Sequence, residues 1–125
     1  MRRFLLVVVL ALTGFACGGD GVKLPDRTSP AVQAEEARIA GVLEASENVW
    51  SPGECRVRLL GRDGATSYVW AHCSDGLSGV SAPRRIDGGR ASGPGDGSLF
   101  TEDVARMSPA EIADLIFERD ERIFP

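Results

Sequence analysis

The chain has 125 residues, which leaves room for one domain rather than two. Its hydrophobic share of 43% and charged share of 26% are those of a globular protein, and this excludes wholesale disorder. Fourteen Lys and Arg stand against 18 Asp and Glu, and the resulting net charge of −4 argues against nucleic acid as a partner, because phosphate binding needs concentrated positive charge.

Residues 1–16 have the parts of a cleaved signal peptide. Met1-Arg2-Arg3 is a short basic start, and the mostly apolar run Phe4–Ala16 is too short to cross a bilayer as a helix. The small residues Gly14 and Ala16 stand at the end of the run, where a peptidase would cut. The sequence therefore predicts export, after which the remaining side chains sum to −6. The alternative is a buried N-terminal helix.

The segment Leu12-Thr13-Gly14-Phe15-Ala16-Cys17 resembles the lipobox of bacterial lipoproteins. The resemblance implies that Cys17 becomes the first residue, carries lipid and attaches the protein to a membrane of the cell envelope. Gly14 replaces the usual leucine, and Phe15 is bulkier than usual. Cleavage without lipidation would instead give a secreted protein. The glycines that follow predict a flexible tether over residues 17–28.

A helix is predicted from Ser29-Pro30, where serine caps and proline occupies the first helical position. The helix should end near Glu47-Asn48. Its apolar residues recur at helical spacing, and its glutamates lie off that stripe; these are Val32, Ile39, Val42 and Leu43, and Glu35, Glu36 and Glu44. Trp50, just beyond the helix, is interpreted as a core residue rather than a ligand-binding ring.

Two strands, Glu54–Leu60 and Ser67–Cys73, are predicted to form an antiparallel hairpin closed by a disulfide. With Cys17 at the cleavage point, Cys55 and Cys73 remain to pair, and a disulfide requires the oxidising compartment that export provides. If these cysteines face each other, Val57–Ala71 and Leu59–Val69 share a small apolar face turned to the core, because side chains alternate along a strand.

The opposite face of this hairpin is the candidate binding surface. We call it the Arg/aromatic face, and it consists of Arg56, Arg58, Tyr68, Trp70 and His72. Arg58 and Trp70 lie opposite each other in this register, close enough for a cation–π contact. Tyr, Trp and Arg dominate binding hot spots, so the face predicts a protein partner or a small anionic ligand. The alternative is that a helix covers the face, and that acidic helices neutralise a basic sheet.

His72 is the only histidine, so candidates for a general base are few. A hydrolase would need a nucleophile within hydrogen-bond reach of His72 and an acid behind it. Asp75 is close in sequence, but no pattern places a serine beside the pair. One histidine beside bonded cysteines also argues against zinc, which needs three or four ligands. No metal or cofactor is expected.

The remaining chain predicts an edge strand and short helices. Leu77–Ile86 is expected at a sheet edge because Pro83 lacks an N–H, and the glycine-rich residues 87–98 are expected to form a loop without phosphate-loop or calcium-loop spacing. Thr101 is expected to cap a short helix to Met107. Ser108-Pro109-Ala110-Glu111 then reads as a capping box that starts another helix.

The sequence therefore predicts an exported, lipid-anchored α+β domain over residues 29–125. It would contain an N-terminal helix, a disulfide-bridged antiparallel sheet of about three strands and one or two short C-terminal helices. The predicted function is a non-enzymatic binding module of the cell envelope whose partner is unknown. The alternative function is a small secreted hydrolase that uses His72.

Overall fold

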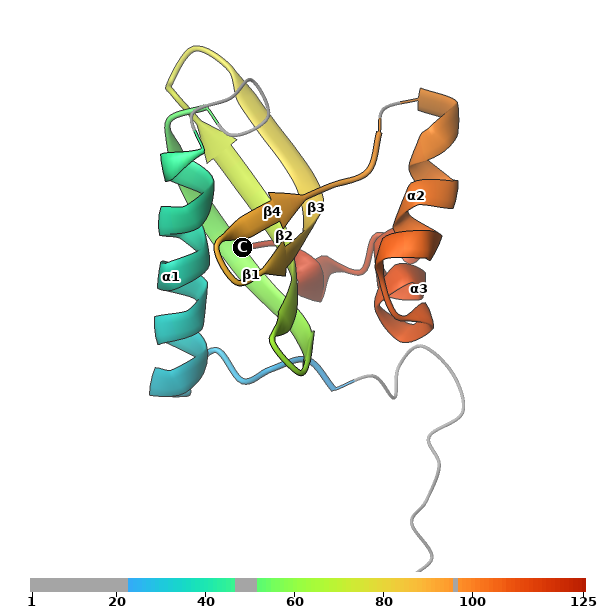
Figure 1. Ribbon diagram of the computed structural model, residues 1–125, viewed down its shortest axis with the longest axis horizontal. Helices are drawn as coiled ribbons and strands as arrows, with labels where there is room; N and C mark the ends of the chain where they lie inside the picture. Colours follow the sequence, from blue (N-terminus) through green and yellow to red (C-terminus); the bar gives the residue numbers. More distant parts are fainter. Residues whose placement is uncertain (1–22, 47–51, 96) are drawn as a thin grey trace, which may run out of the picture.

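A computed structural model describes residues 23–46, 52–95 and 97–125, and it confirms the predicted α+β class (Figure 1). Helix α1 precedes a four-stranded antiparallel sheet, and two short helices follow it. The predictions for the leader, for lipid on Cys17 and for Trp50 concern residues outside the described ranges. Within those ranges no helix has the length and apolar character needed to cross a membrane.

The elements follow one another with short connections. The helices are α1 (Pro30–Ala45), α2 (Phe100–Met107) and α3 (Ala110–Glu118), with 3-10 turns η2 (Gly97–Leu99) and η3 (Glu121–Ile123). The strands are β1 (Glu54–Asp63), β2 (Thr66–Ser74), β3 (Gly79–Asp87) and β4 (Arg90–Ser92), and they lie in the sheet in the order β1-β2-β3-β4.

The β1–β2 hairpin has the predicted register. Cys55 lies opposite Cys73 and is bonded to it, and Val57 and Leu59 lie opposite Ala71 and Val69. The pairing shifts between Leu59 and Gly61, which is a β-bulge with an extra residue in β1. The predicted alternation of side chains therefore holds from Cys55 to Leu59, and the bulge interrupts it.

The sheet has one strand more than expected. Residues Arg90–Ser92 form β4 within the stretch predicted to be a loop, and they pair with Arg85–Asp87 of β3. The two glycines between the strands, Gly88 and Gly89, permit a two-residue hairpin turn, and Gly88 has a φ of 62°. Pro83 lies outside the part of β3 that pairs with β4, so the edge predicted there is present.

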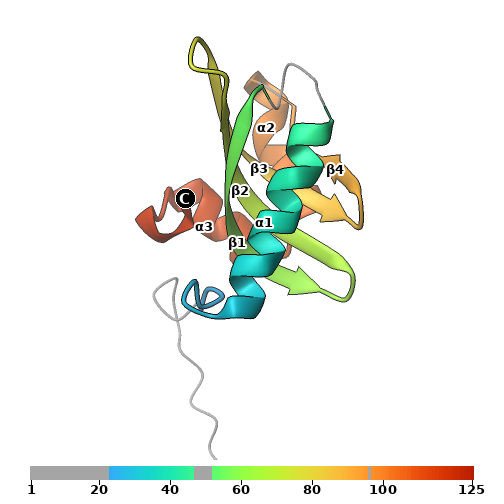
Figure 2. The same cartoon turned by 90° about the vertical axis from the view of Figure 1, so that its left-hand side faces the viewer.

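Helix α1 covers one face of the sheet (Figure 2). Ile39 and Leu43 are fully buried, and they pack against the apolar side chains of β1 and β2 and against Ile86 of β3. This first core includes the disulfide. Its sheet residues are Cys55, Val57, Leu59, Val69, Ala71, Cys73 and Ile86. The small apolar face predicted from the cysteine register is therefore the one that α1 buries.

Two glutamates of α1, which lie off its apolar stripe, accept hydrogen bonds from the backbone of the edge strand β1. The Oε2 atom of Glu36 accepts from the Leu59 N–H at 2.7 Å, and the Oε1 atom of Glu44 accepts from the Cys55 N–H at 2.9 Å. Eight helical residues rise about 12 Å and four strand residues span about 13 Å, so the two spacings match when α1 runs antiparallel to β1. The helix thus supplies acceptors for N–H groups that no neighbouring strand can pair.

The C-terminal helices cover part of the opposite face and make the domain three-layered (Figure 1). Leu60 and Tyr68 of the sheet are buried against Val104 of α2, the apolar stripe of α3, and Ile123 of η3. Leu60 belongs to this second core together with Ile112, Ala113, Leu115 and Ile116. The apolar side chains of α3 are therefore buried.

Ser29 is the N-cap of α1 and Pro30 is its first helical residue, as predicted, although the serine side chain makes no capping hydrogen bond. The other two predicted caps are wrong, because Thr101 lies inside α2 rather than before it and Pro109 rather than Ser108 is the N-cap of α3. Ser108 instead ends α2, with its N–H donated to the Val104 carbonyl. Its backbone is extended, because a residue that precedes a proline is disfavoured in the helical conformation. Its hydroxyl is buried and has no partner in the part of the chain that the structure describes.

Candidate functional site

The structure divides the Arg/aromatic face into a buried half and an accessible half. Arg58 and Tyr68 are each 6% exposed, because α3 and η3 pack over this part of the sheet. Trp70 and His72 are half-buried, and Arg56 is exposed. A partner could therefore reach Arg56, Trp70 and His72, whereas Arg58 and Tyr68 belong to the interior.

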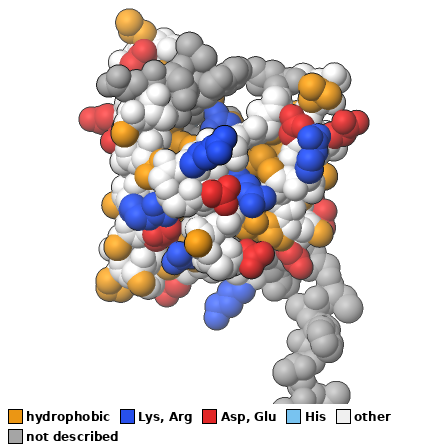
Figure 3. All heavy atoms as spheres, in the orientation of Figure 1, with side chains coloured by type: hydrophobic (Ala, Val, Ile, Leu, Met, Phe, Trp, Pro, Cys, Tyr) orange, Lys and Arg blue, Asp and Glu red, His pale blue; other side chains and the backbone are white. Residues whose placement is uncertain are grey.

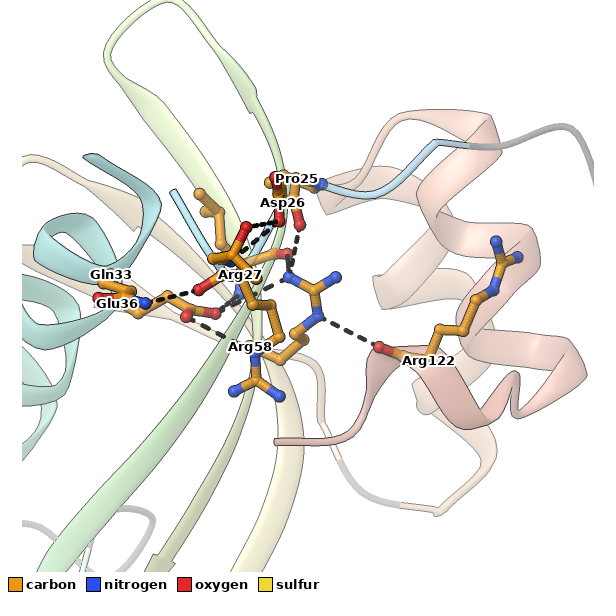
Figure 4. A network of polar contacts seen from close by, with 9 residues as sticks. Pro25, Asp26, Arg27, Gln33, Glu36, Arg58 and Arg122 are labelled. Atoms are coloured by element: carbon orange, nitrogen blue, oxygen red, sulfur yellow. Dashed lines mark hydrogen bonds and ion pairs between the residues drawn. The ribbon is translucent and has the colours of Figure 1, made fainter. Parts of the chain in front are cut away.

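Arg58 ties the N-terminal segment and the C-terminal turn to the sheet (Figure 4). Its guanidinium donates to the carbonyl oxygens of Pro25 at 2.9 Å and Arg122 at 3.2 Å, and it lies 4.0 Å from the Glu36 carboxylate. Burial lowers the pKa of Arg58, with a smaller contribution from nearby Arg27. These contacts use the guanidinium inside the molecule, so its role is structural.

The accessible half is a row of polar side chains across three strands. Arg56 lies opposite His72, and His72 lies opposite Ser81 of β3, so all three side chains are on the same face of the sheet. Together with Phe124 and Pro125 they line a hollow of about 290 Å³, which we call the Arg56 hollow. Ser81 and Phe124 were missed from the sequence, because only the register of β3 and the path of the C-terminal residues bring them here.

Trp70 forms one side of this region. Its indole Nε1–H donates to the Ser81 hydroxyl at 2.8 Å, and its ring meets Phe124 edge-on, with centroids 5.1 Å apart at 86°. The indole therefore fixes both the serine and the aromatic side chain of the C-terminal segment. Phe124 keeps 39% of its surface exposed.

The arrangement around His72 differs from a catalytic triad. The Ser81 hydroxyl is engaged by Trp70, and no hydrogen bond joins it to His72 in the ranges that the structure covers. Asp75 is held in the β2–β3 turn, where its Oδ1 accepts from the N–H groups of Leu77 and Ser78 at 2.9 and 2.8 Å. These backbone bonds lower the pKa of Asp75. The carboxylate thus stabilises the turn instead of orienting the imidazole.

A second hollow lies on the other side of Arg56 and His72 and has a different polarity. It has about 460 Å³ and is lined by Glu44, Glu54, Cys55, Arg56, His72 and Ser74. Its two carboxylates make it unsuitable for an anion. In the residues that the structure describes, no group of three or more His, Cys, Asp or Glu side chains could hold a metal ion.

A third hollow, of about 410 Å³, lies between the β3–β4 hairpin and α2. Its cations already have partners: Arg85 bonds Asp87 at 3.1 Å, and Arg106 bonds Asp103 at 2.9 Å. Acidic and basic side chains alternate on the face of the molecule seen in Figure 3. This region therefore offers no concentrated charge of one sign.

No protein-family model matches the chain, and no curated protein or solved structure is significantly similar to it.

Proposed function

We propose that the protein is an exported, lipid-anchored binding module that presents the accessible half of its Arg/aromatic face to a partner in the cell envelope. The signal-peptide pattern and the lipobox-like junction at Cys17 support the anchor. The Cys55–Cys73 bond agrees with an oxidising compartment. The partner would be a protein or a small anionic ligand.

The observation that carries the binding role is the environment of Arg56. Arg58 and Arg85 contact carbonyl or carboxylate oxygens, but Arg56 has no hydrogen bond or ion pair in the part of the chain that the structure describes. It is exposed beside a half-buried tryptophan and histidine. An exposed arginine among aromatic side chains is the composition found at binding hot spots.

The position of the N-terminal segment suits a domain that presents the Arg56 hollow away from the membrane. Residues 23–28 lie at the end of the molecule opposite the β2–β3 turn (Figure 1). The Arg56 hollow lies on the side of that turn, because Arg56, His72 and Ser81 are near the ends of β1, β2 and β3 that adjoin it. Leu24 packs on the second core and Pro25 bonds Arg58. A tether bound to a membrane through Cys17 would thus join the domain at the end that lies farther from the hollow.

The anchor is tested by the intact mass of the protein extracted from membranes of a bacterial host. We expect a mass for residues 17–125 plus lipid, with two thiols appearing only after reduction. The matched variant Cys17→Ser should leave the membrane fraction. A membrane-free wild-type protein with a thiol on Cys17 would contradict the anchor.

The binding face is tested by photo-crosslinking in intact cells. A photoreactive residue in place of His72 should give a discrete adduct, and the same residue in place of Arg90, an exposed position on β4, should not. Adding Arg56→Gln should reduce the adduct at position 72. Equal adduct yields from both positions, or a yield insensitive to Arg56, would contradict a binding role for this face.

A further inference from the structure

We propose that the Arg56 hollow binds an organic carboxylate attached to an apolar body. This inference deepens the proposed function and rests on it only for the location of the ligand. Three features of the molecule support it: the donors that line the hollow, the apolar groups beside them and the charges in the neighbouring hollow.

Three side-chain donors face the hollow. The Arg56 guanidinium has five N–H groups in a planar fork, and His72 always carries at least one ring N–H. The Ser81 hydroxyl accepts from Trp70, which leaves its own hydrogen available to donate. All three side chains stand on one face of the sheet in a single row. The hollow thus offers donors from three adjacent strands to one ligand group.

The lining of the hollow favours an anion with a single charge. No acidic side chain is among its lining residues, Arg56, His72, Ser81, Phe124 and Pro125, whereas the neighbouring hollow contains Glu44 and Glu54. One guanidinium balances one negative charge, and its two parallel N–H groups match the two oxygens of a carboxylate. A phosphate dianion would require further cations that the row does not provide.

The apolar part of the ligand has its own surface. Phe124 and Pro125 form one wall of the hollow, and Trp70 supports Phe124 edge-on. Phe124 is one of the few large apolar side chains with more than a third of its surface exposed. Covering it removes apolar area from water, while the carboxylate bonds Arg56. A volume of about 290 Å³ suits a small acid or the last residue of a peptide.

The test is a ligand titration of the processed protein, residues 17–125, in which NMR monitors the signal of the Trp70 indole N–H. This N–H is bonded to Ser81 at the edge of the hollow. The probe is N-acetyl-phenylalanine, and its primary amide is the matched control with the same body and no charge. We expect a saturable shift of the Trp70 signal with the acid and at least tenfold weaker binding with the amide. Inorganic phosphate should compete poorly.

Variants test whether the Arg56 guanidinium binds the carboxylate of the ligand. Arg56→Gln should weaken binding of the acid at least tenfold, and Arg56→Lys should weaken it less, because the charge remains but the planar fork is lost. Arg90→Gln removes the same charge from an exposed site on β4 and should change the affinity less than twofold. Phe124→Ala should weaken acids with an aromatic body more than it weakens acetate.

Two further arms distinguish the sources of the carboxylate. A tetrapeptide ending in phenylalanine with a free carboxyl group is compared with its C-terminal amide and with 3-phenylpropionate. Tighter binding of the free-ended peptide identifies a protein C-terminus, and tighter binding of the small acid identifies a free metabolite. Equal binding of acid and amide, an unchanged affinity in Arg56→Gln, or no shift at millimolar acid would overturn the proposal. None of these results would affect the membrane-anchor and crosslinking tests of the proposed function.

Discussion

At the scale of single residues, the Glu36 carboxylate has the most demanding position. It accepts from the Leu59 N–H, lies 3.8 Å from Arg27 and lies 4.0 Å from the buried Arg58. One half-buried side chain thus pairs an edge N–H and balances an interior cation. The apolar spacing of α1 gave no indication of this, because a glutamate beside an apolar stripe is usually solvated.

Substitutions at Glu36 separate its two roles. Glu36→Gln keeps an acceptor for Leu59 but removes the charge, and Glu36→Ala removes both. We expect Glu36→Ala to lower the free energy of unfolding by about 1–3 kcal/mol and Glu36→Gln to lower it by less, measured by urea denaturation. Glu111→Ala, an exposed glutamate of α3, serves as the control and should change it by under about 0.5 kcal/mol. A large effect of Glu111→Ala would indicate a general charge effect instead.

The low pKa of Glu35 predicts that the free energy of unfolding decreases at acidic pH. Hydrogen bonds from Arg38, at 2.7 and 3.0 Å, lower the pKa of Glu35 from 4.5 to about 2, and a hydrogen bond from Ser67 contributes less to this decrease. Because the folded pKa is depressed, this stabilisation is complete above pH 4.5 and is lost as the pH falls toward 2. With screening at the half-exposed Arg38, we expect a contribution of about 1–2 kcal/mol. Denaturation of wild type and Glu35→Gln should differ at pH 7 and converge near pH 2.

Alanine substitutions at two glycines should change the stability in opposite directions. Gly53 has a φ of 69°, and a Cβ there would lie 2.2 Å from the Ser74 carbonyl oxygen, so Gly53→Ala should destabilise the protein by more than about 2 kcal/mol. Gly41 lies within α1 with nothing within 4 Å of a Cβ, so Gly41→Ala should stabilise it by about 0.5–1 kcal/mol. Thermal unfolding of the two variants measures both effects. Loss of stability in Gly41→Ala would contradict this placement of the helix.

At the scale of the elements, what could be predicted depended on whether the signal was local. Alternation and two cysteines were sufficient for the β1–β2 register, because a shift by one residue would separate Cys55 from Cys73 and reverse both faces. The bulge at Leu60 and the role of Ser108 depend on the packing of neighbouring elements. The hairpin at Gly88-Gly89 does have a local signal, the glycine pair itself, which the predicted loop over residues 87–98 overlooks. Ser81 could not be assigned to the candidate site before the register of β3 was known.

The disulfide joins the first two strands under α1, and its removal has an expected size. The bond links residues separated by 18 positions, for which the chain-entropy model gives about 3 kcal/mol. The double variant Cys55→Ala/Cys73→Ala should lose about that amount by urea denaturation, together with a smaller loss from reduced packing. The free energy of unfolding of this double variant should be the same with and without a reducing agent. That of the wild-type protein should fall on reduction.

At the scale of the whole molecule, Arg58 of the sheet connects the segment before α1 to the turn after α3. Its contacts reach residue 25 before α1 and residue 122 after α3, and these positions are distant in sequence but adjacent in space (Figure 4). The variant Arg58→Met keeps much of the volume and removes these hydrogen bonds. We expect faster amide exchange around Thr28 and Ile123, with less change in Val69, and exchange followed by NMR measures this difference. Uniform acceleration in all three would indicate global destabilisation instead.

The hydrogen bond from Arg58 to Pro25 also determines where a mechanical load enters the domain. Tension applied before Lys23 reaches this contact, and through it the middle of β1, before it reaches the first turn of α1. Strand β1 is held by its ladder with β2 and by the disulfide, and many bonds must break together when a strand is loaded along its length. Helix α1 could otherwise be peeled from the sheet one turn at a time. A pull from the N-terminal side must therefore break the hydrogen bond between Arg58 and Pro25 before it loads the first turn of α1.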